Sequence, residues 1–291
     1  MKNLEKLAEL AQTLPAKYKA NAVALVEKMG EILEGFGDNP VEWRPENLKV
    51  VQGTSDRSKL PKNATIGSMI LKGAILEQPL SSIPLRIDTT RQYWNPDPEK
   101  AQMICSSPDD KVGFNYGNCK VCPYSVFDKE TNKSQCNKNL SILNIAEDFS
   151  TIFWTNFSKT NYASGTDWQK LMRGAGVSTY KRPYHLSTET SKKSKNVEVI
   201  KAEPILDAKI EGAQLLFVEE LYRLMVEERK NQLVRFYEYV ESRKTGQANA
   251  SLAAPTHVVE LLSAPEDNET VPFDTSTETT EVVSKGKSYK L

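Results

Sequence analysis

The segment CSSPDDKVGFNYGNCKVCPYSVFDKETNKSQC, residues 105–136, contains all four cysteines of a 291-residue chain. Thirteen residues separate Cys105 from Cys119 and thirteen separate Cys122 from Cys136, while Cys119 and Cys122 form a CxxC pair. Such a pair can bind one face of a metal ion. The two outer thiolates would complete a tetrahedral Zn²⁺ site, in which Zn–S distances are about 2.3 Å. The four cysteines therefore predict a closed, structural zinc site in an inserted loop.

Two disulfides are the alternative that an even number of cysteines permits. The first residues of the chain do not show the apolar pattern of a signal peptide. We therefore expect a reducing compartment, the cytoplasm, or the host cytoplasm if the protein is viral. Cysteines in such a compartment bind metals more often than they form disulfides. Turn-forming residues fill the arms between the cysteines, which favours hairpins whose ends are tied by a metal.

Charge and hydropathy exclude some classes of partner. Lysine plus arginine and aspartate plus glutamate are equally numerous, at 38 each. The whole chain therefore gives no electrostatic reason to bind nucleic acid, and any such binding must come from local patches. No run of about 18 apolar residues is present, so we exclude a membrane-spanning helix and expect no membrane partner.

The first 39 residues predict a helical arm. Leucines at intervals of three and four indicate a helix that ends near Pro15, and a second apolar stripe ends at Gly35 and Gly37. Two interpretations remain open. The two helices either pack within their own domain or form an arm that docks on a neighbouring molecule and supports self-association.

Residues 40–203 are typical of a β-barrel, because short apolar runs alternate with glycine, proline and polar turn formers. The cysteine segment then becomes an elaborated loop between two strands. A short helix is expected at 164–172. The candidate strands are 48–52, 66–71, 74–76, 83–87, 140–145, 151–157, 180–186 and 196–201.

The last part of the chain divides into a helix and a tail. Apolar residues from Leu206 onward repeat at helical intervals, which predicts a helix over 204–245 of roughly 40 residues and about 60 Å. Its second half could pack on another subunit or lie across its own barrel. Residues 246–291 are polar and mostly acidic, and we expect them to be disordered. Such a tail solvates the protein, competes with nucleic acid, or recruits replication or recombination proteins.

Motifs of common catalytic sites are absent from the sequence. There is no GxSxG, HExxH or GxxxxGK[ST] pattern, and the deaminase signature that joins a CxxC pair to His-x-Glu is also missing. The only histidines, His185 and His257, lie far from the cysteines. Acidic residues such as Asp97, Asp109 and Asp110 are better explained as turn formers. We therefore predict a protein that is not an enzyme.

Local patches of aromatic and basic residues favour binding to a single strand of nucleic acid. Bases stack on exposed rings, while lysine and arginine side chains follow the phosphates. The alternative is that the rings belong to the core and the lysines to a solvated loop. The candidate nucleic-acid-binding residues are Arg91, Tyr93, Trp94, Tyr180, Lys181, Arg182, Tyr184, Lys192, Lys193 and Lys195.

This combination of features resembles the single-stranded-DNA-binding proteins of tailed bacteriophages, in particular the gene-32-type helix-destabilising proteins. Members of that family carry a zinc subdomain in an oligonucleotide-binding (OB) fold, and the resemblance covers about residues 45–201. Their zinc ligands are one histidine and three cysteines with the CxxC pair last, whereas Cys119 and Cys122 are central here. The resemblance implies a non-catalytic protein that coats single-stranded DNA, regardless of base sequence, during replication or recombination.

The predicted fold class is α+β: an OB-like β-barrel with an inserted four-cysteine zinc loop, N-terminal helices and a long C-terminal helix. Two other functions stay open. One is a structural or adaptor protein whose zinc loop and long helix dock protein partners. The other is a zinc-stabilised subunit of a nucleic-acid enzyme whose active residues have no recognisable motif.

Overall fold

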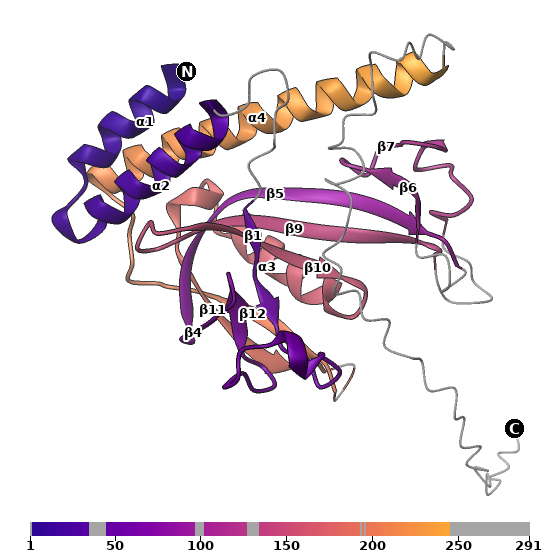
Figure 1. Cartoon of the computed structure of the whole chain (residues 1–291), viewed down its shortest axis with the longest axis horizontal. Helices are drawn as coiled ribbons and strands as arrows, with labels where there is room; N and C mark the ends of the chain where they lie inside the picture. Colours follow the sequence, from indigo (N-terminus) through magenta and orange to yellow (C-terminus); the bar gives the residue numbers. More distant parts are fainter. Residues whose placement is uncertain are drawn as a thin grey trace, which may run out of the picture.

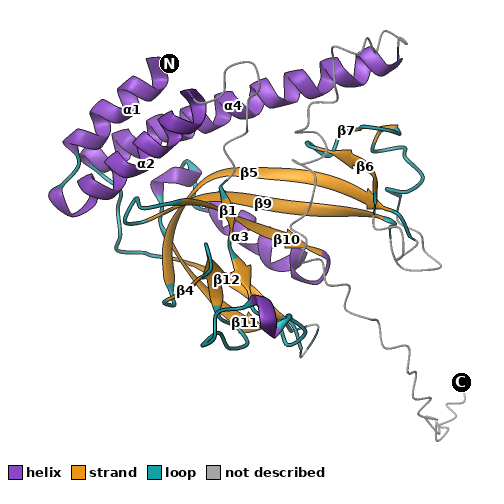
Figure 2. Ribbon diagram, viewed as in Figure 1, coloured by secondary structure: helices purple, strands orange, loops and turns teal. Residues whose placement is uncertain are grey.

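The computed structural model describes residues 2–34, 45–96, 102–126, 134–192, 194 and 196–244. Predictions for the tail, residues 246–291, and for Lys193 and Lys195 lie outside these residues. The described chain is a mixed α+β structure in which a curled sheet carries helices on both faces (Figures 1 and 2). No described helix is both long enough and apolar enough to cross a bilayer.

The elements follow one another in an order close to the sequence-based expectation. The helices are α1 (Lys2–Thr13), α2 (Ala16–Glu34), α3 (Tyr162–Gly174) and α4 (Gly212–Lys244), with short 3₁₀ turns at η1 (Arg57–Lys59), η2 (Lys159–Asn161) and η3 (Thr179–Lys181). The strands are β1 (Glu46–Asn47), β2 (Lys49–Val50), β3 (Met69–Leu71), β4 (Ala74–Leu76), β5 (Leu80–Trp94), β6 (Met103–Ser107), β7 (Val112–Gly113), β8 (Gly117–Asn118), β9 (Cys136–Ala146), β10 (Ile152–Ser158), β11 (Tyr184–Thr190) and β12 (Glu198–Pro204).

The main sheet has the order β1-β10-β9-β5-β11-β12, and β6 is added to the far end of β5. Strand β5 is the centre of this arrangement, because its start pairs with β11, most of its length pairs with β9, and its end pairs with β6. The register with β9 shifts between Pro84 and Arg86. A bulge of this kind bends a strand and tolerates a proline. The bend lets β5 pair with β11 at its start and with β9 and β6 along the rest of its length.

Each face of the sheet has its own apolar core. On β9, Leu140 and Ile142 point to the inner face, where they meet Trp168 of α3. Leu143 and Ile145 alternate with them and point to the outer face, which α1, α2 and α4 cover. Both faces are buried over residues 142–146, where apolar side chains point to both sides of the strand.

The N-terminal helices pack within their own chain. The apolar stripes of α1 and α2 join the outer core together with the first half of α4, and the Lys6 ammonium pairs with the Glu220 carboxylate at 2.6 Å. The interpretation in which both helices belong to the same domain therefore describes this chain. Their apolar faces are covered without a second molecule.

Helix α4 begins at Gly212, so the predicted start near Pro204 is wrong. Pro204 is the last residue of β12, and Leu206, which fits the helical repeat, is 78% exposed in the connection. The helix has 33 residues and a length of about 50 Å. It lies across its own sheet, because its first half joins the outer core and Phe236 and Val240 in its second half pack on the cysteine loop.

Two side-chain amides connect the small sheet β2-β3-β4 to the main sheet. The Gln52 amide donates to the Glu198 carbonyl at 2.9 Å and accepts from the Glu198 N–H at 2.8 Å. The Gln78 amide likewise donates to the Gly67 carbonyl at 2.8 Å and accepts from the Thr188 N–H at 3.0 Å. Each side-chain amide hydrogen-bonds to backbone groups as the peptide group of a neighbouring strand would. The backbone groups of Glu198 and Thr188 at the edges of β12 and β11 therefore have partners without a further paired strand.

Candidate metal centre and nucleic-acid interface

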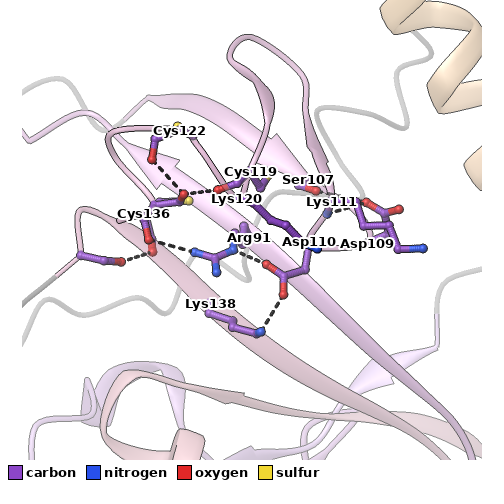
Figure 3. A network of polar contacts seen from close by, with 12 residues as sticks. Arg91, Ser107, Asp109, Asp110, Lys111, Cys119, Lys120, Cys122, Cys136 and Lys138 are labelled. Atoms are coloured by element: carbon purple, nitrogen blue, oxygen red, sulfur yellow. Dashed lines mark hydrogen bonds and ion pairs between the residues drawn. The ribbon is translucent and has the colours of Figure 1, made fainter. Parts of the chain in front are cut away.

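The cysteine loop, residues 95–135, connects β5 to β9 and contains β6, β7 and β8. Cys105 lies on β6 and Cys136 is the first residue of β9, while Cys119 and Cys122 lie on the turn that follows β8. All four are buried free thiols. They line the same small pocket although as many as 31 positions separate them in the sequence. Three of them are labelled in Figure 3.

Backbone and hydroxyl groups already point at two of the sulfurs. The Asn115 N–H donates to Cys105 Sγ at 3.4 Å, and the Ser107 hydroxyl is hydrogen-bonded to Cys119. A β-carbon on Gly113 would lie 2.9 Å from Cys105 Sγ and 3.7 Å from Cys119 Sγ. Only glycine leaves room for Cys105 Sγ there. Hydrogen bonds to sulfur of this kind support metal-bound thiolates in proteins.

Charged groups surround the thiols. The Arg91 guanidinium lies beside Cys136 and Cys119 and donates to the Asp110 carboxylate, which also binds the Lys138 ammonium at 2.6 Å (Figure 3). Burial raises the pKa of the Cys136 thiol to about 11 and also raises that of Cys119. Without a metal both groups are therefore protonated near neutral pH, and metal binding would release their protons.

The set of donors fits Zn²⁺ in kind, since four thiolates make a closed tetrahedral site. Their present arrangement is looser than coordination requires. Within the described residues, no group of three or more histidine, cysteine or acidic side chains is close enough to hold a metal ion. The zinc site therefore stays a prediction, supported by the shared pocket and by the hydrogen bonds to sulfur.

The second half of α4 packs on the cysteine loop and forms hydrogen bonds with it. Arg229 donates to the Pro108 carbonyl, and the Tyr237 hydroxyl donates to the Asp109 carboxylate. Burial and this carboxylate raise the pKa of Tyr237 to about 12. Near the end of the helix, the ring of Tyr239 stacks on Phe114 with 5.4 Å between centroids. The loop is thus held from one side by its strands and from the other by α4.

Three of the four aromatic residues predicted to face a groove are in the core. Tyr184 is 1% exposed and packs edge-on against Trp168, while Tyr180 is buried against Tyr222. Tyr93 is 7% exposed and lies in the cysteine pocket. The prediction of free stacking faces is wrong for these three rings, because neighbouring side chains already cover them. Trp94, the last residue of β5, is partly exposed.

The predicted basic residues do not gather at one place. The Arg91 guanidinium forms an ion pair with the Asp110 carboxylate at the end of β5. Lys181 and Arg182 precede β11, whereas Lys192 follows it and is exposed, so the seven-residue strand, about 23 Å long, lies between them. The hypothesis of a single basic cluster is therefore wrong for Lys181 and Arg182, and for the loop around Lys192 it stays a prediction.

The sequence reasoning missed a row of polar residues on the outer face, here called the outer polar strip: Thr90, Asn139, Ser141, Asn156 and Ser158. Asn139 lies opposite both Thr90 and Ser158, and Asn156 lies opposite Ser141. All five are partly exposed. The alternation of polar and aromatic residues in 152–158 is the signal that could have identified it.

No protein family, curated protein or solved structure matches this chain. Its function must therefore be argued from topology, burial and the chemistry of named side chains.

Proposed function

We propose that this chain binds single-stranded DNA without sequence preference and without catalysis, in replication or recombination, through an OB-like barrel with a zinc loop. The observation that carries the proposal is the strand connectivity. A meander of β5, β9 and β10 is followed by α3 and then by the hairpin β11-β12, which returns to pair with β5. A five-stranded, partly open barrel with this type of connection is the architecture of OB folds.

The position of the polar residues supports the same proposal. In OB folds, oligonucleotides bind on the face of the second and third strands and against the loops after the first and fourth strands. The corresponding strands here are β9 and β10, whose outer face carries the outer polar strip. The corresponding loops are the cysteine loop and the loop that contains Lys192. Amide and hydroxyl groups can bind bases and phosphates, while the lysine contributes charge.

Zinc has a structural part in this proposal. Four thiolates would fill all four positions of the ion, so no open position would remain for substrate water. The energy of metal binding would instead order the cysteine loop. That loop is one of the two that flank the proposed binding face.

A titration of labelled oligothymidine with the full chain, followed by fluorescence anisotropy at two salt concentrations, tests the proposal. Binding should weaken with salt, with a log–log slope of about −0.7 per phosphate neutralised. Ser141→Ala should weaken binding by about 2- to 10-fold through the loss of one hydrogen bond. Ser187→Ala, the same change on β11 of the same sheet, should leave the affinity unchanged.

A chain that shows no affinity for any single strand at low salt would contradict the proposal. The adaptor function would then replace it, and one observation favours that alternative. On the cysteine loop, Val121 is 75% exposed and Val126 is also exposed. A protein partner that covered these two side chains would bury apolar surface on binding.

A further inference from the structure

Three tyrosines of the cysteine loop and its flanking strand, Tyr93, Tyr124 and Tyr116, form a group that we call the tyrosine stack. Tyr93 and Tyr124 are nearly parallel, with 4.3 Å between ring centroids. Tyr116 is tilted against Tyr124, with a centroid distance of 4.9 Å. Exposure increases along the stack, because Tyr93 is 7% exposed, Tyr124 is intermediate and Tyr116 is 42% exposed. The group thus has a buried end and an open end.

The thiol pocket fixes the order of these rings. Tyr93 lies opposite Cys136 in the pairing of β5 with β9, and the Cys136 N–H donates to the Tyr124 carbonyl at 2.7 Å. Tyr116 precedes Gly117, whose φ of +69° allows the tight turn between β7 and β8. All three tyrosines line the same pocket as the four cysteines. The stack is therefore part of the cysteine loop and depends on how the loop is folded.

We propose that the exposed face of Tyr116 is a stacking platform for one base of a bound single strand. The inference rests on the proposed function and adds a binding residue that lies outside the barrel. A ring supported from behind by two other rings loses little conformational freedom on binding, so little of the stacking energy is spent on ordering it. Every base has an aromatic face, and stacking on Tyr116 is therefore tolerant of sequence.

The cations of the cysteine loop and of the start of β9 suit a nucleic acid better than an apolar peptide. Lys120 is exposed and follows the β7-β8 hairpin directly. Lys138 is partly exposed on β9, and it shares the carboxylate of Asp110 with Arg91. Two cations thus share one anion. Phosphates of a strand stacked on Tyr116 could then pair with ammonium groups of the cysteine loop and of β9.

The test compares Tyr116→Phe with Tyr116→Leu in the full chain. Phenylalanine keeps the ring, and leucine keeps an apolar side chain without an aromatic face. We expect Tyr116→Phe to bind labelled oligothymidine within about 2-fold of the wild type. Tyr116→Leu should lose about 5- to 150-fold, and by the same factor at low and high salt, because stacking is not screened. Leu206→Ser, a change at a distant exposed position, should have no effect.

Two further measurements separate this inference from simpler explanations. Metal analysis of each variant shows whether leucine has disturbed the thiol pocket. Photocross-linking of wild type to an oligonucleotide with 5-iododeoxyuridine should join the base to Tyr116. If wild type binds strands but Tyr116→Leu binds equally well, or if no cross-link forms at Tyr116, the ring only covers the thiols and the inference is wrong. If wild type binds no strand, the proposed function itself fails.

Discussion

The contact between helix α3 and strand β10 can be tested at a single glycine. Gly165 is buried in the first half of α3, directly above Phe157. A β-carbon at this position would lie 2.5 Å from Cγ of Phe157 and 2.7 Å from its Cβ. These atoms are close to the backbone of β10, so a rotation of the ring cannot relieve the overlap. The Gly165→Ala variant must therefore move the helix or the strand.

The size of the effect follows from two opposing terms. Alanine is favoured over glycine inside a helix by about 1 kcal/mol. Inserting a carbon atom into a close-packed contact costs about 1–3 kcal/mol, and the short distances to Phe157 put this case at the upper end. We expect a net loss of about 2 kcal/mol. For a folded part of the size that the structure describes, that lowers the melting temperature by about 4–8 °C.

Gly174→Ala is the matched control, because Gly174 ends the same helix and nothing lies within 4 Å of its β-carbon position. Thermal unfolding followed by tryptophan fluorescence compares the variants, and Trp168 in the inner core is a local probe. Gly174→Ala should be as stable as wild type or slightly more stable. If Gly165→Ala behaves in the same way, α3 does not pack on β10 as described, and the inner face of the curled sheet is not covered by this helix.

Three further predictions concern the cysteine loop, α4 and the tail. Purified protein should contain about one Zn²⁺ per chain, and Cys119→Ser should lose the metal and expose 105–136 to proteolysis; metal-free protein with disulfide-linked peptides would contradict this. Burial and a hydrogen bond raise the pKa of Tyr237 from 10.0 to about 12, so its contribution to stability is complete below about pH 10 and is lost as the pH rises towards 12. The unfolding free energy of Tyr237→Phe should consequently fall less than that of wild type over this pH range, and equal slopes would refute the assignment. Deleting the acidic residues 264–291 should tighten binding of oligothymidine most at low salt, where charges are least screened, whereas an unchanged affinity would leave the tail as a partner-binding or solvating segment.

The sequence predicted the central strands well, because burial leaves a periodic trace in them. The apolar run in β9 and the alternation in β10 coincide with strands buried on two faces and on alternate residues, respectively. The strand expected over 83–87 is much longer, Leu80–Trp94. Its second half begins with Asp88, a residue type that is depleted in strands, and lacks the apolar run of the first half. Pairing with β9 and β6 holds that half in place, and such pairing is not visible in local sequence.

The beginning of α4 shows how a helical repeat can mislead. Leu206 and Ile210 continue the three- and four-residue spacing of the helix, but both precede its first turn at Gly212. Pro204 lacks a backbone N–H, and in the structure it ends β12 at the edge of the sheet. Periodicity shows that apolar residues recur every three or four positions. Where the helix starts depends on what the preceding residues pair with, and here residues up to Pro204 pair as strand β12.

Local sequence did not predict whether an aromatic ring faces solvent or the core. A ring beside a basic residue has the same sequence pattern whether it faces solvent or the core, and Tyr184 and Tyr180 turned out to pack on Trp168 and Tyr222. What distinguishes the faces is the long-range register of the strands. The same register places Tyr93 opposite Cys136.

A functional consequence follows from that pairing. The cysteine loop is attached to the curled sheet by β5 and β9, and α4 holds it through Tyr237 and Arg229. A metal that tightened the four thiols would therefore act on Tyr116 at one end and on the proposed binding face of β9 at the other. Loss of the metal should weaken strand binding more than loss of either contact surface alone, since it disturbs both together.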